Sequence, residues 1–430
     1  MKKLVLTAAA LFLLQSFAFA QDSTKVGVTL YGFVRNYLTF DSRKTYTVVG
    51  GEYNMIPYDH NMYGDAAVAV DLNDVPSMQF QALTSRFGLD ITGPKLWGWS
   101  SSGKLEGDFG GFGTTNTVLR LRLAYFKLAK GGSELLMGQD WHPLSGDIMP
   151  DVLGMAAGAP FRPHSRTPQI RATRYWGSFG YTGALLWQLQ YMNNGPKDAS
   201  DASSEASISY ANNALWPEGF LGFNFKQGAW YAQLGVDAQI LRPRTHVVVA
   251  WNTLMRKVDE RVVSITPTLY AQYVGEMWSV KMRTMLAQNT SHLNQLVGYG
   301  VTGVNVDGSW NYAPLNATIS YLNVSYGRKY RVNLFLGYMK NLGANEDLYD
   351  FGYAGYRIYM KGGNNFTHLN SVYRISPSVS YNIKAFNLGL EYEWTACTYG
   401  DLSGNGSIQN NDNLHRVANH RVCLMVKYNF

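Results

Sequence analysis

In Leu119-Arg-Leu-Arg-Leu-Ala-Tyr125, leucines alternate with Arg120 and Arg122. Successive side chains of an extended strand point to opposite faces, so this stretch has one apolar face and one basic face. The C-terminal stretch Val422-Cys-Leu-Met-Val-Lys-Tyr-Asn-Phe430 repeats the pattern, with apolar residues at its even-numbered positions. A soluble amphipathic strand gives the same alternation. The number of such segments therefore has to decide between a soluble β protein and a membrane-spanning barrel.

Segments of this kind recur along the whole chain. A membrane-spanning strand needs about 9–11 residues with an apolar residue at every second position. We expect strands near residues 26–41, 78–92, 101–110, 117–129, 133–140, 166–175, 179–192, 219–227, 229–241, 262–274, 277–289, 311–325, 329–341, 370–382, 385–398 and 418–430. Beyond the N-terminus there is no uninterrupted apolar run long enough for a membrane-spanning helix.

The connections between these segments alternate in length. Long connections such as 42–77, 141–165 and 399–417 alternate with short ones such as Lys130-Gly-Gly132. Outer-membrane barrels have short periplasmic turns, long outer loops and an even number of strands, whereas a soluble all-β protein has no reason to sort its loops this way. The tryptophans at 97, 99, 176, 230 and 278 all lie beside short turns, as in an interfacial aromatic girdle. The sequence therefore predicts an all-β fold, a transmembrane antiparallel up-and-down barrel of about 16 strands in the bacterial outer membrane.

Two prolines lie inside expected strands. Pro267 and Pro377 each lack the N–H group that a β-ladder needs. We expect both to occupy β-bulges.

The N-terminus reads as an export signal. Lys2 and Lys3 precede the apolar run Leu4–Phe17, and Ala18-Phe19-Ala20 forms a small-residue cleavage site. We expect residues 1–20 to be removed, so that residues 21–430 form a single barrel domain. Removal of the two lysines would lower the formal net charge from +7 to +5. That charge is mild and dispersed, which argues against a nucleic-acid partner.

Five stretches resemble the 16-stranded bacterial porins, and within them the DcaP-like group. They are Ser85-Arg-Phe-Gly88, Gly107-Asp-Phe-Gly110, Leu119–Leu128, Leu135-Leu-Met-Gly-Gln-Asp-Trp141 and Arg166-Thr-Pro-Gln-Ile-Arg171. The terminal Val426-Lys-Tyr-Asn-Phe430 is similar to the aromatic-ended signal by which the barrel-assembly machinery recognises its substrates. The resemblance implies a homotrimer in outer-membrane lipid, a third loop folded into the lumen, and a preference for small anionic solutes. Members of the group often carry an N-terminal helical extension, whereas here Gln21 leads almost directly into the first strand.

No enzyme signature is found. The chain lacks metalloprotease, nucleophile-elbow and phosphate-loop motifs, and its two cysteines are not at metal-binding spacing. The eight histidines fall mostly in expected outer loops, where a solvated surface position is the favoured interpretation. The sequence therefore predicts no catalytic residues, no metal and no cofactor.

The loop at 141–165 is the strongest functional candidate. It combines Asp147 and Asp151 with apolar residues such as Met149, Leu153 and Phe161, and an exposed loop is usually more polar. Folding into the lumen would bury that surface and narrow a channel that 16 strands leave open. An outer loop that covers a neighbouring subunit is the alternative.

Passive diffusion of small hydrophilic solutes is the leading functional hypothesis. The alternatives are a closed barrel with an adhesive or structural role and a receptor-type transporter with a plug. A plugged transporter of 22 strands needs a plug domain before its first strand and a longer chain.

Strand parity predicts which charges line the pore. Phe87, Leu89 and Ile91 would face lipid on their strand, which turns Arg86 inward, and the same test applies to the other basic residues. We expect Arg86, Arg120, Arg122 and Arg171 to form a basic ladder on the lumen wall, with Glu106, Asp108, Asp140, Asp147 and Asp151 as the acidic side of the constriction. Selectivity follows the lining charges, so we expect a modest preference for anions, with small anionic or neutral solutes as the partners of the pore.

The two cysteines flank the last long loop. Cys397 and Cys423 are nearly equidistant from its centre near residue 410, and both have inward parity. A disulfide is compatible with an exported protein. Two free thiols are the equal alternative, since the bridge requires Cα atoms within about 7 Å.

Overall fold

The computed structural model describes most of the chain. It covers residues 26–48, 51, 53–65, 68–111, 118–145, 148–197, 204–249, 254–352, 355–360 and 368–430. The predicted signal at 1–20 lies outside the described residues.

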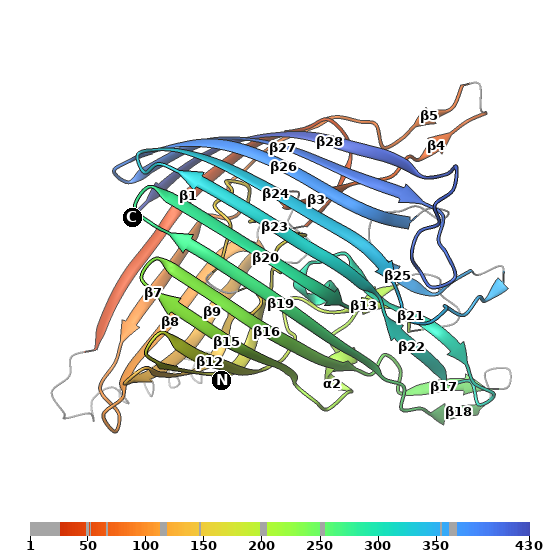
Figure 1. The fold of residues 1–430 in the computed structure, drawn as a ribbon, viewed down its shortest axis with the longest axis horizontal. Coiled ribbons are helices and arrows are strands. Elements are labelled where there is room, and N and C mark those ends of the chain that lie inside the picture. Colours follow the sequence, from red (N-terminus) through yellow and green to blue (C-terminus); the bar gives the residue numbers. More distant parts are fainter. Residues whose placement is uncertain are drawn as a thin grey trace, which may run out of the picture.

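Sixteen antiparallel strands close into one barrel, in which β6 and β7 are the two parts of one interrupted strand (Figure 1). The strands are β1 (Gly27–Asp41), β6 (Ser77–Gln81), β7 (Arg86–Thr92), β8 (Ser100–Gly111), β9 (Val118–Lys130), β10 (Ser133–Trp141), β11 (Arg166–Trp176), β12 (Phe179–Leu186), β15 (Glu218–Gln227), β16 (Trp230–Leu241), β19 (Val262–Val274), β20 (Trp278–Gln288), β23 (Asn316–Tyr326), β24 (Tyr330–Gly343), β26 (His368–Ile383), β27 (Phe386–Gly400) and β28 (His415–Asn429). Consecutive strands pair with each other, and β6 and β7 both pair with β1. Pairing of β1 with β28 closes the ring, and Gly32 and Phe430 exchange both backbone hydrogen bonds at 3.0 Å. The predicted fold class is confirmed.

The connections alternate between short and long, as the sequence predicts. Short turns gather at the end where the C-terminus lies, and the long connections carry their own small elements at the other end (Figure 1). These are β2 (Thr45–Val48), β3 (Tyr53–Pro57), β4 (Met62–Tyr63), β5 (Val70–Asp71), β13 (Asn194–Gly195), β14 (Glu205–Ala206), α2 (Ser209–Asn212), β17 (His246–Val249), β18 (Leu254–Lys257), η2 (Ser291–Leu293), β21 (Val297–Val304), β22 (Trp310–Pro314) and β25 (Ile358–Met360). Across the described part of the chain, neither helix is long and apolar enough to cross a bilayer.

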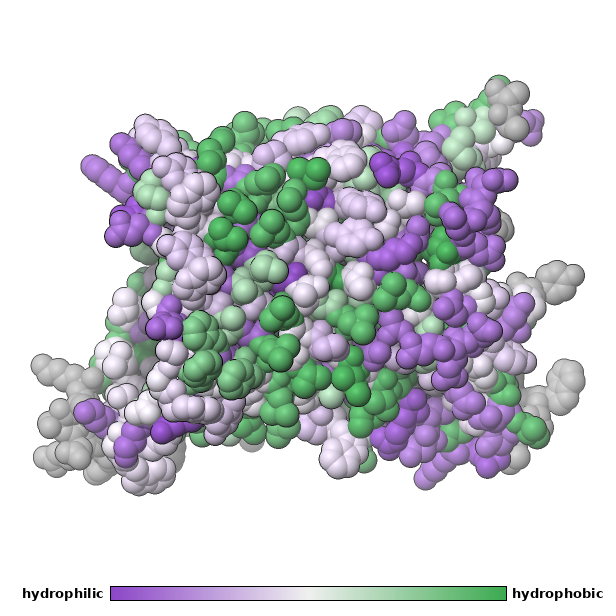
Figure 2. All heavy atoms as spheres, viewed as in Figure 1, coloured by the Kyte–Doolittle hydropathy of each residue, from purple (hydrophilic) through white to green (hydrophobic). Residues whose placement is uncertain are grey.

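The outer face of the barrel is apolar and the inner face polar. Burial alternates residue by residue, as in β19, where Val263 and Ile265 are exposed while Ser264 and Thr266 are buried. Apolar side chains cover the middle of the strands, and hydrophilic ones dominate the end with the long connections (Figure 2). Inverted burial of this kind places the apolar stripe of each strand where lipid would be.

Aromatic side chains surround the end with the short turns. The indole rings of Trp176, Trp230 and Trp278 are each about half exposed. The ring centroid of each lies within 6 Å of the ring centroid of a tyrosine on the next strand. Exposed aromatic pairs at one level of a barrel are typical of a membrane interface.

Three expected strands are shorter than predicted. The segment 78–92 is interrupted because Ser85 N–H bonds to Ala82 O, which forms a tight turn between β6 and β7. The segment 179–192 leaves the barrel after Leu186. In the segment 311–325, the residues up to Pro314 belong to β22 and pair with β21, and the barrel strand begins at Asn316.

The two prolines do not form bulges. Pro267 pairs with Val236 and Pro377 with Leu334 without any register shift at either position. On the other side of each strand the ladder is missing: the pairs of β19 with β20 begin only at Thr268, and those of β26 with β27 skip Ser376 and Pro377. Near Pro267 the Gln288 side chain accepts from Ile265 N–H at 2.8 Å, and this bond replaces part of the lost ladder.

Candidate functional site in the barrel interior

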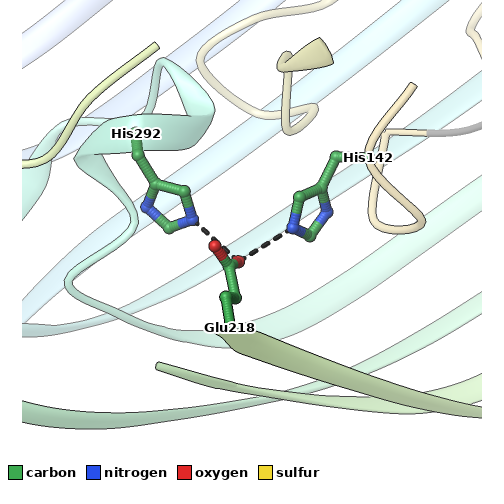
Figure 3. A group of neighbouring side chains, drawn as sticks. All are labelled: His142, Glu218 and His292. Atoms are coloured by element: carbon green, nitrogen blue, oxygen red, sulfur yellow. Dashed lines mark hydrogen bonds and ion pairs between the residues drawn. The ribbon is translucent and has the colours of Figure 1, made fainter. Parts of the chain in front are cut away.

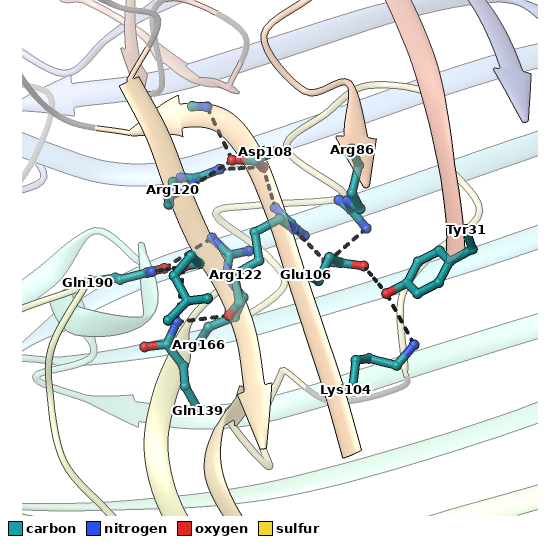
Figure 4. A network of polar contacts seen from close by, with 12 residues as sticks. Tyr31, Arg86, Lys104, Glu106, Asp108, Arg120, Arg122, Gln139, Arg166 and Gln190 are labelled. Carbon is teal, nitrogen blue, oxygen red and sulfur yellow. Dashed lines mark hydrogen bonds and ion pairs between the residues drawn. The ribbon is translucent and has the colours of Figure 1, made fainter. Parts of the chain in front are cut away.

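Two of the expected pore-lining arginines, Arg120 and Arg122 on β9, are buried against acids on β8 (Figure 4). Arg120 donates from Nε and Nη2 to the two carboxylate oxygens of Asp108, at 2.9 and 2.8 Å. Arg122 bridges both acids, with Nη1 2.7 Å from Asp108 and Nε 2.7 Å from Glu106. Such charge-assisted, partly bidentate pairs hold the side chains in fixed positions.

The other two arginines are also paired with acids, but keep some exposure. On β7, Arg86 lies 3.5 Å from Glu106, and its guanidinium group stacks over Phe33 at 5.0 Å. On β11, Arg171 donates to Asp140 on β10 at 2.7 Å. The side chains of Arg86 and Arg171 are 19% and 18% exposed.

The expected opposition of a basic wall and an acidic side needs correction for three of the acids. Glu106, Asp108 and Asp140 stand beside the arginines on neighbouring strands. The physical reason is the strand spacing of about 4.8 Å, which brings inward-facing side chains of adjacent strands into direct contact. Asp147 lies outside the described residues.

Asp151 contacts the opposite wall of the barrel. Its carboxylate accepts from Lys281 on β20 at 2.8 Å and from Arg331 on β24 at 2.7 Å. Ser325 adds a third bond at 2.9 Å. Although burial favours the neutral acid, these partners hold the pKa of Asp151 below its usual value. In the order of pairing, β24 is the eighth strand from β10, so it lies across the ring from the strand that precedes the loop.

The rest of the loop after β10 is anchored to the same wall. The amides of Leu153 and Gly154 donate to the buried Glu391 on β27 at 2.7 and 3.1 Å. Tyr37 on β1 donates its hydroxyl to Leu153 O at 2.8 Å, and Arg374 on β26 donates to Ala159 O at 2.7 Å. Ile148, Met155 and Phe161 of the loop are buried in the same cluster as apolar side chains of the wall. The backbone of this loop is therefore satisfied by inward-facing groups of the barrel.

A second inward segment, β3 in the first long connection, was not foreseen. All five of its residues are buried. Arg374 donates to Met55 O at 2.7 Å, and Asn54 donates to Glu393 on β27 at 2.7 Å. Tyr53 and His164 of the loop after β10 are hydrogen-bonded at 3.1 Å, so the two connections meet. The run Tyr53-Asn-Met-Ile-Pro57, largely apolar in a long connection, was the available signal.

Two arginines that sequence reasoning missed, Arg162 and Arg166, surround Trp141 together with Arg122. The guanidinium carbons of Arg122, Arg162 and Arg166 lie 5.8, 5.2 and 4.9 Å from its ring centroid, within cation–π range. Arg162 and Arg166 are fully buried, and Arg162 donates to His164 Nδ1 at 3.0 Å. Burial and these cations hold the pKa of His164 well below its usual value, so the imidazole is neutral.

Three histidines depart from the expected solvated surface. His142, His164 and His292 are each no more than 2% exposed. They are buried because the connections that carry them turn inward and contact the barrel wall.

A cavity of about 780 Å³ lies between these connections and the end with the short turns. On the side of the loop after β10 it is lined by Trp141, Pro143 and Ile148. Its charged lining residues are Lys95, Lys130, Glu134, Asp140, Arg171 and Lys226. The lining thus has four basic and two acidic side chains, and Asp140 is already paired with Arg171.

The cysteines are free and buried. The register of β27 and β28 pairs Cys397 with Val417 and Cys423 with Glu391. The two cysteines are thus offset by six positions along the ladder, roughly 20 Å at 3.4 Å per residue. The disulfide alternative is wrong because the hairpin is not centred near residue 410, the point midway between the two cysteines in the sequence.

Comparisons with known proteins agree on the fold. No protein-family model matches the chain, and no curated protein matches it. The solved structure of the outer membrane channel DcaP of Acinetobacter baumannii is similar over 96% of this chain and 99% of its own, with a TM-score of 0.63 and 18% sequence identity. OmpT, an outer membrane protein of Vibrio cholerae solved in trimer form, is similar over 95% of this chain and 100% of its own, with a TM-score of 0.52 and 11% identity. The chain therefore has the 16-stranded barrel fold of outer-membrane channels.

Proposed function

We propose that the protein is an outer-membrane pore through which small hydrophilic solutes diffuse passively. The observation that carries this proposal is a closed barrel, apolar outside and polar inside, that holds a charged cavity of about 780 Å³. That volume is ample for a small solute, since ligand sites of 300–1,000 Å³ hold drug-sized molecules. The apolar outer face and the aromatic side chains at one end support a position in the outer membrane.

The loop 141–165 narrows the lumen in this proposal. Support comes from its contacts with β1, β20, β24, β26 and β27, all made by inward-facing groups. The segment β3 adds to the narrowing from the side of the first connection. A loop held by several hydrogen bonds to the barrel gives a constriction of defined shape.

A modest anion preference follows from the accessible charges. Arg120 and Arg122 are buried, and Asp108 and Glu106 neutralise their charges. These two arginines therefore contribute less to the selectivity of the pore than the number of lining arginines suggests. The lining of the cavity, with its excess of basic side chains, is the better support for the preference. Arginine favours carboxylate and phosphate groups over other anions because its planar donors bind two oxygens at once.

We also propose the membrane surroundings, the oligomeric state and the assembly route of the protein. We place the protein in lipid as a homotrimer, assembled by the barrel machinery through Phe430, with no catalytic role. The trimeric form of OmpT, a protein with the same fold, supports the homotrimer. A native mass in mild detergent that corresponds to three chains would agree, and a single-chain mass would contradict the trimer.

Conductance across a planar bilayer tests the pore. The purified protein should produce large, steady current steps, and its reversal potential in a KCl gradient should indicate anion selectivity. Replacement of Lys130 and Lys226 by Gln should move that potential toward cation selectivity, because both side chains are exposed and line the cavity. The matched control is Arg256→Gln, which removes an exposed cation from the outer hairpin of β17 and β18.

Two results would overturn the proposal in different ways. Absence of current steps would favour a closed barrel with an adhesive or receptor role. Current steps with a reversal potential that the double variant does not change would keep the pore and reject this cavity as the selective part of the path.

A further inference from the structure

Two histidines and a glutamate from three separate segments meet inside the barrel (Figure 3). His142 follows β10, Glu218 begins β15, and His292 belongs to η2 in the connection after β20. The Nε2 atoms of His142 and His292 lie 2.8 and 3.0 Å from the same oxygen of Glu218, Oε1. All three side chains are at most 5% exposed.

A second acidic side chain lies beside the cluster. Asp237 on β16 pairs with Phe220, so it lies diagonal to Glu218 on the same inner face. Its Oδ1 atom is 3.8 Å from His142 Nε2 and buried. Only the ligand atoms of His142, Glu218 and His292, however, all lie within 4.8 Å of one another.

We propose that His142, Glu218 and His292 bind one divalent transition-metal ion of the zinc class, with a water molecule in the fourth position. Two imidazoles and a carboxylate are ligands that suit zinc and its neighbours, whereas calcium and magnesium prefer oxygen ligands alone. Bonds of about 2.0–2.1 Å to a tetrahedral ion place ligand atoms roughly 3.3 Å apart. The two histidine nitrogens lie 2.8 and 3.0 Å from Glu218 Oε1, and the three ligand atoms all lie within 4.8 Å of one another, so side-chain adjustments suffice.

Ion binding would be coupled to the turn that starts the loop after β10. His142 Nδ1 now accepts a hydrogen bond from Leu144 N–H at 3.1 Å, which places its own proton on Nε2. An imidazole that binds metal through Nε2 carries its proton on Nδ1. The ion would therefore replace the Leu144 hydrogen bond, a loss that metal coordination far exceeds.

The site would fasten the base of this loop to the barrel wall. Its ligands connect the first residue after β10 with β15 and the connection that contains η2. The apex of the same loop is anchored separately, by Asp151 and by Glu391. A metal at the base would hold the entry of the loop independently of those apex contacts.

The spacing in sequence explains why no motif indicated this site. Glu218 lies 76 residues from His142 and 74 residues from His292. Metal motifs are recognised when ligands share a helix or a turn. Here the ligands meet only because two connections turn inward over the same pair of strands.

Cobalt binding to the full barrel in detergent tests the proposal. The protein is treated with EDTA, dialysed into metal-free buffer and titrated with Co²⁺, which absorbs strongly in the visible range when four-coordinate. We expect one Co²⁺ per chain and displacement by Zn²⁺. The His292→Gln and Glu218→Gln variants should bind at least about tenfold more weakly. The control His246→Gln, which removes an exposed histidine on β17, should bind as the wild type does.

The result with the wild type alone can overturn the inference. If the untouched barrel shows no four-coordinate Co²⁺ spectrum, the cluster is a hydrogen-bond network in which both histidines donate to Glu218. The same conclusion follows if His292→Gln binds normally while its mobility in unheated electrophoresis shows a folded barrel. If the variants fail to fold, the wild-type titration and its displacement by Zn²⁺ still decide.

Discussion

The two walls of the barrel use their basic side chains in different ways. On the near wall, from β7 to β11, arginines pair with acids of the adjacent strands, as Arg120 and Arg122 do with Asp108. On the far wall, from β20 to β27, basic side chains also bind the inward connections: Lys281 binds Asp151, and Arg374 binds backbone carbonyls of residues 55 and 159 in addition to its ion pair with Glu393 on the adjacent strand.

The difference separates two roles of charge inside a pore. Near-wall pairs join neighbouring strands, so their loss should affect the stability of the barrel. Far-wall contacts join the wall to a loop, so their loss should affect the position of that loop and leave the barrel intact.

The largest effect is expected for Asp108→Asn on the near wall. The carboxylate accepts from both Arg120 and Arg122 and is fully buried. Its neutralisation removes the acid that pairs with the buried Arg120 and leaves Arg122 with Glu106, and breaking a buried ion pair costs about 3–5 kcal/mol. The free energy of unfolding in urea, measured in lipid vesicles, should fall by about that amount.

A matched pair on the same wall provides the control. Glu134 and Lys127 are 3.2 Å apart on neighbouring strands but about one third exposed. Exposed pairs contribute about 0–1 kcal/mol, so Glu134→Gln should change the unfolding free energy little. Equal losses in the two variants would show that burial does not distinguish the near-wall pairs.

An intermediate effect is expected for Asp151→Asn on the far wall. The change weakens the bonds to Lys281 and Arg331 and should cost the attachment of the loop about 1–3 kcal/mol. The detached state would become about 5–150 times more populated. Single-channel recordings should show more frequent current fluctuations and greater anion selectivity, since two cations are released, while the unfolding free energy of the barrel changes little.

The control for this variant removes an acid outside the barrel. Asp307→Asn breaks an ion pair with Arg256 in the outer connections. Its recordings should match those of the wild type. If the recordings of Asp151→Asn also match those of the wild type, the apex of the loop is held by Glu391 and the backbone contacts without a contribution from Asp151.

The strands could be predicted from the sequence because each carries its own signal. Period-2 alternation is enforced by contact with lipid outside and polar groups inside, so β19 was predicted at its observed limits. The shorter strands were missed where a local event ended the ladder, such as the turn at Ala82–Ser85. Alternation persists through such a turn and cannot reveal it.

The interior site was predictable only in part. Parity indicates which way Arg120 points, but not which acid it meets, because the partner depends on the register of β8 and β9. The inward path of β3 and the meeting of His142 with His292 depend on the three-dimensional course of long connections. Those contacts join residues more than 70 positions apart, for which no local pattern exists.

The smallest effect, and the finest test of the far wall, is the pH dependence of the loop. Lys281 and Arg331 keep the pKa of Asp151 below its usual value despite burial. A carboxyl group whose pKa is lowered by folding stabilises the folded arrangement fully above its unfolded pKa, about 3.9, and this contribution is lost as the pH falls through the lowered value. Loss of the Asp151 contact should therefore add to the current fluctuations of the wild type only below about pH 4, whereas Asp151→Asn should fluctuate at every pH. An increase already at pH 6 in both proteins would assign the transition to a group other than Asp151, and the distinction between the two walls would then need a second titrating contact.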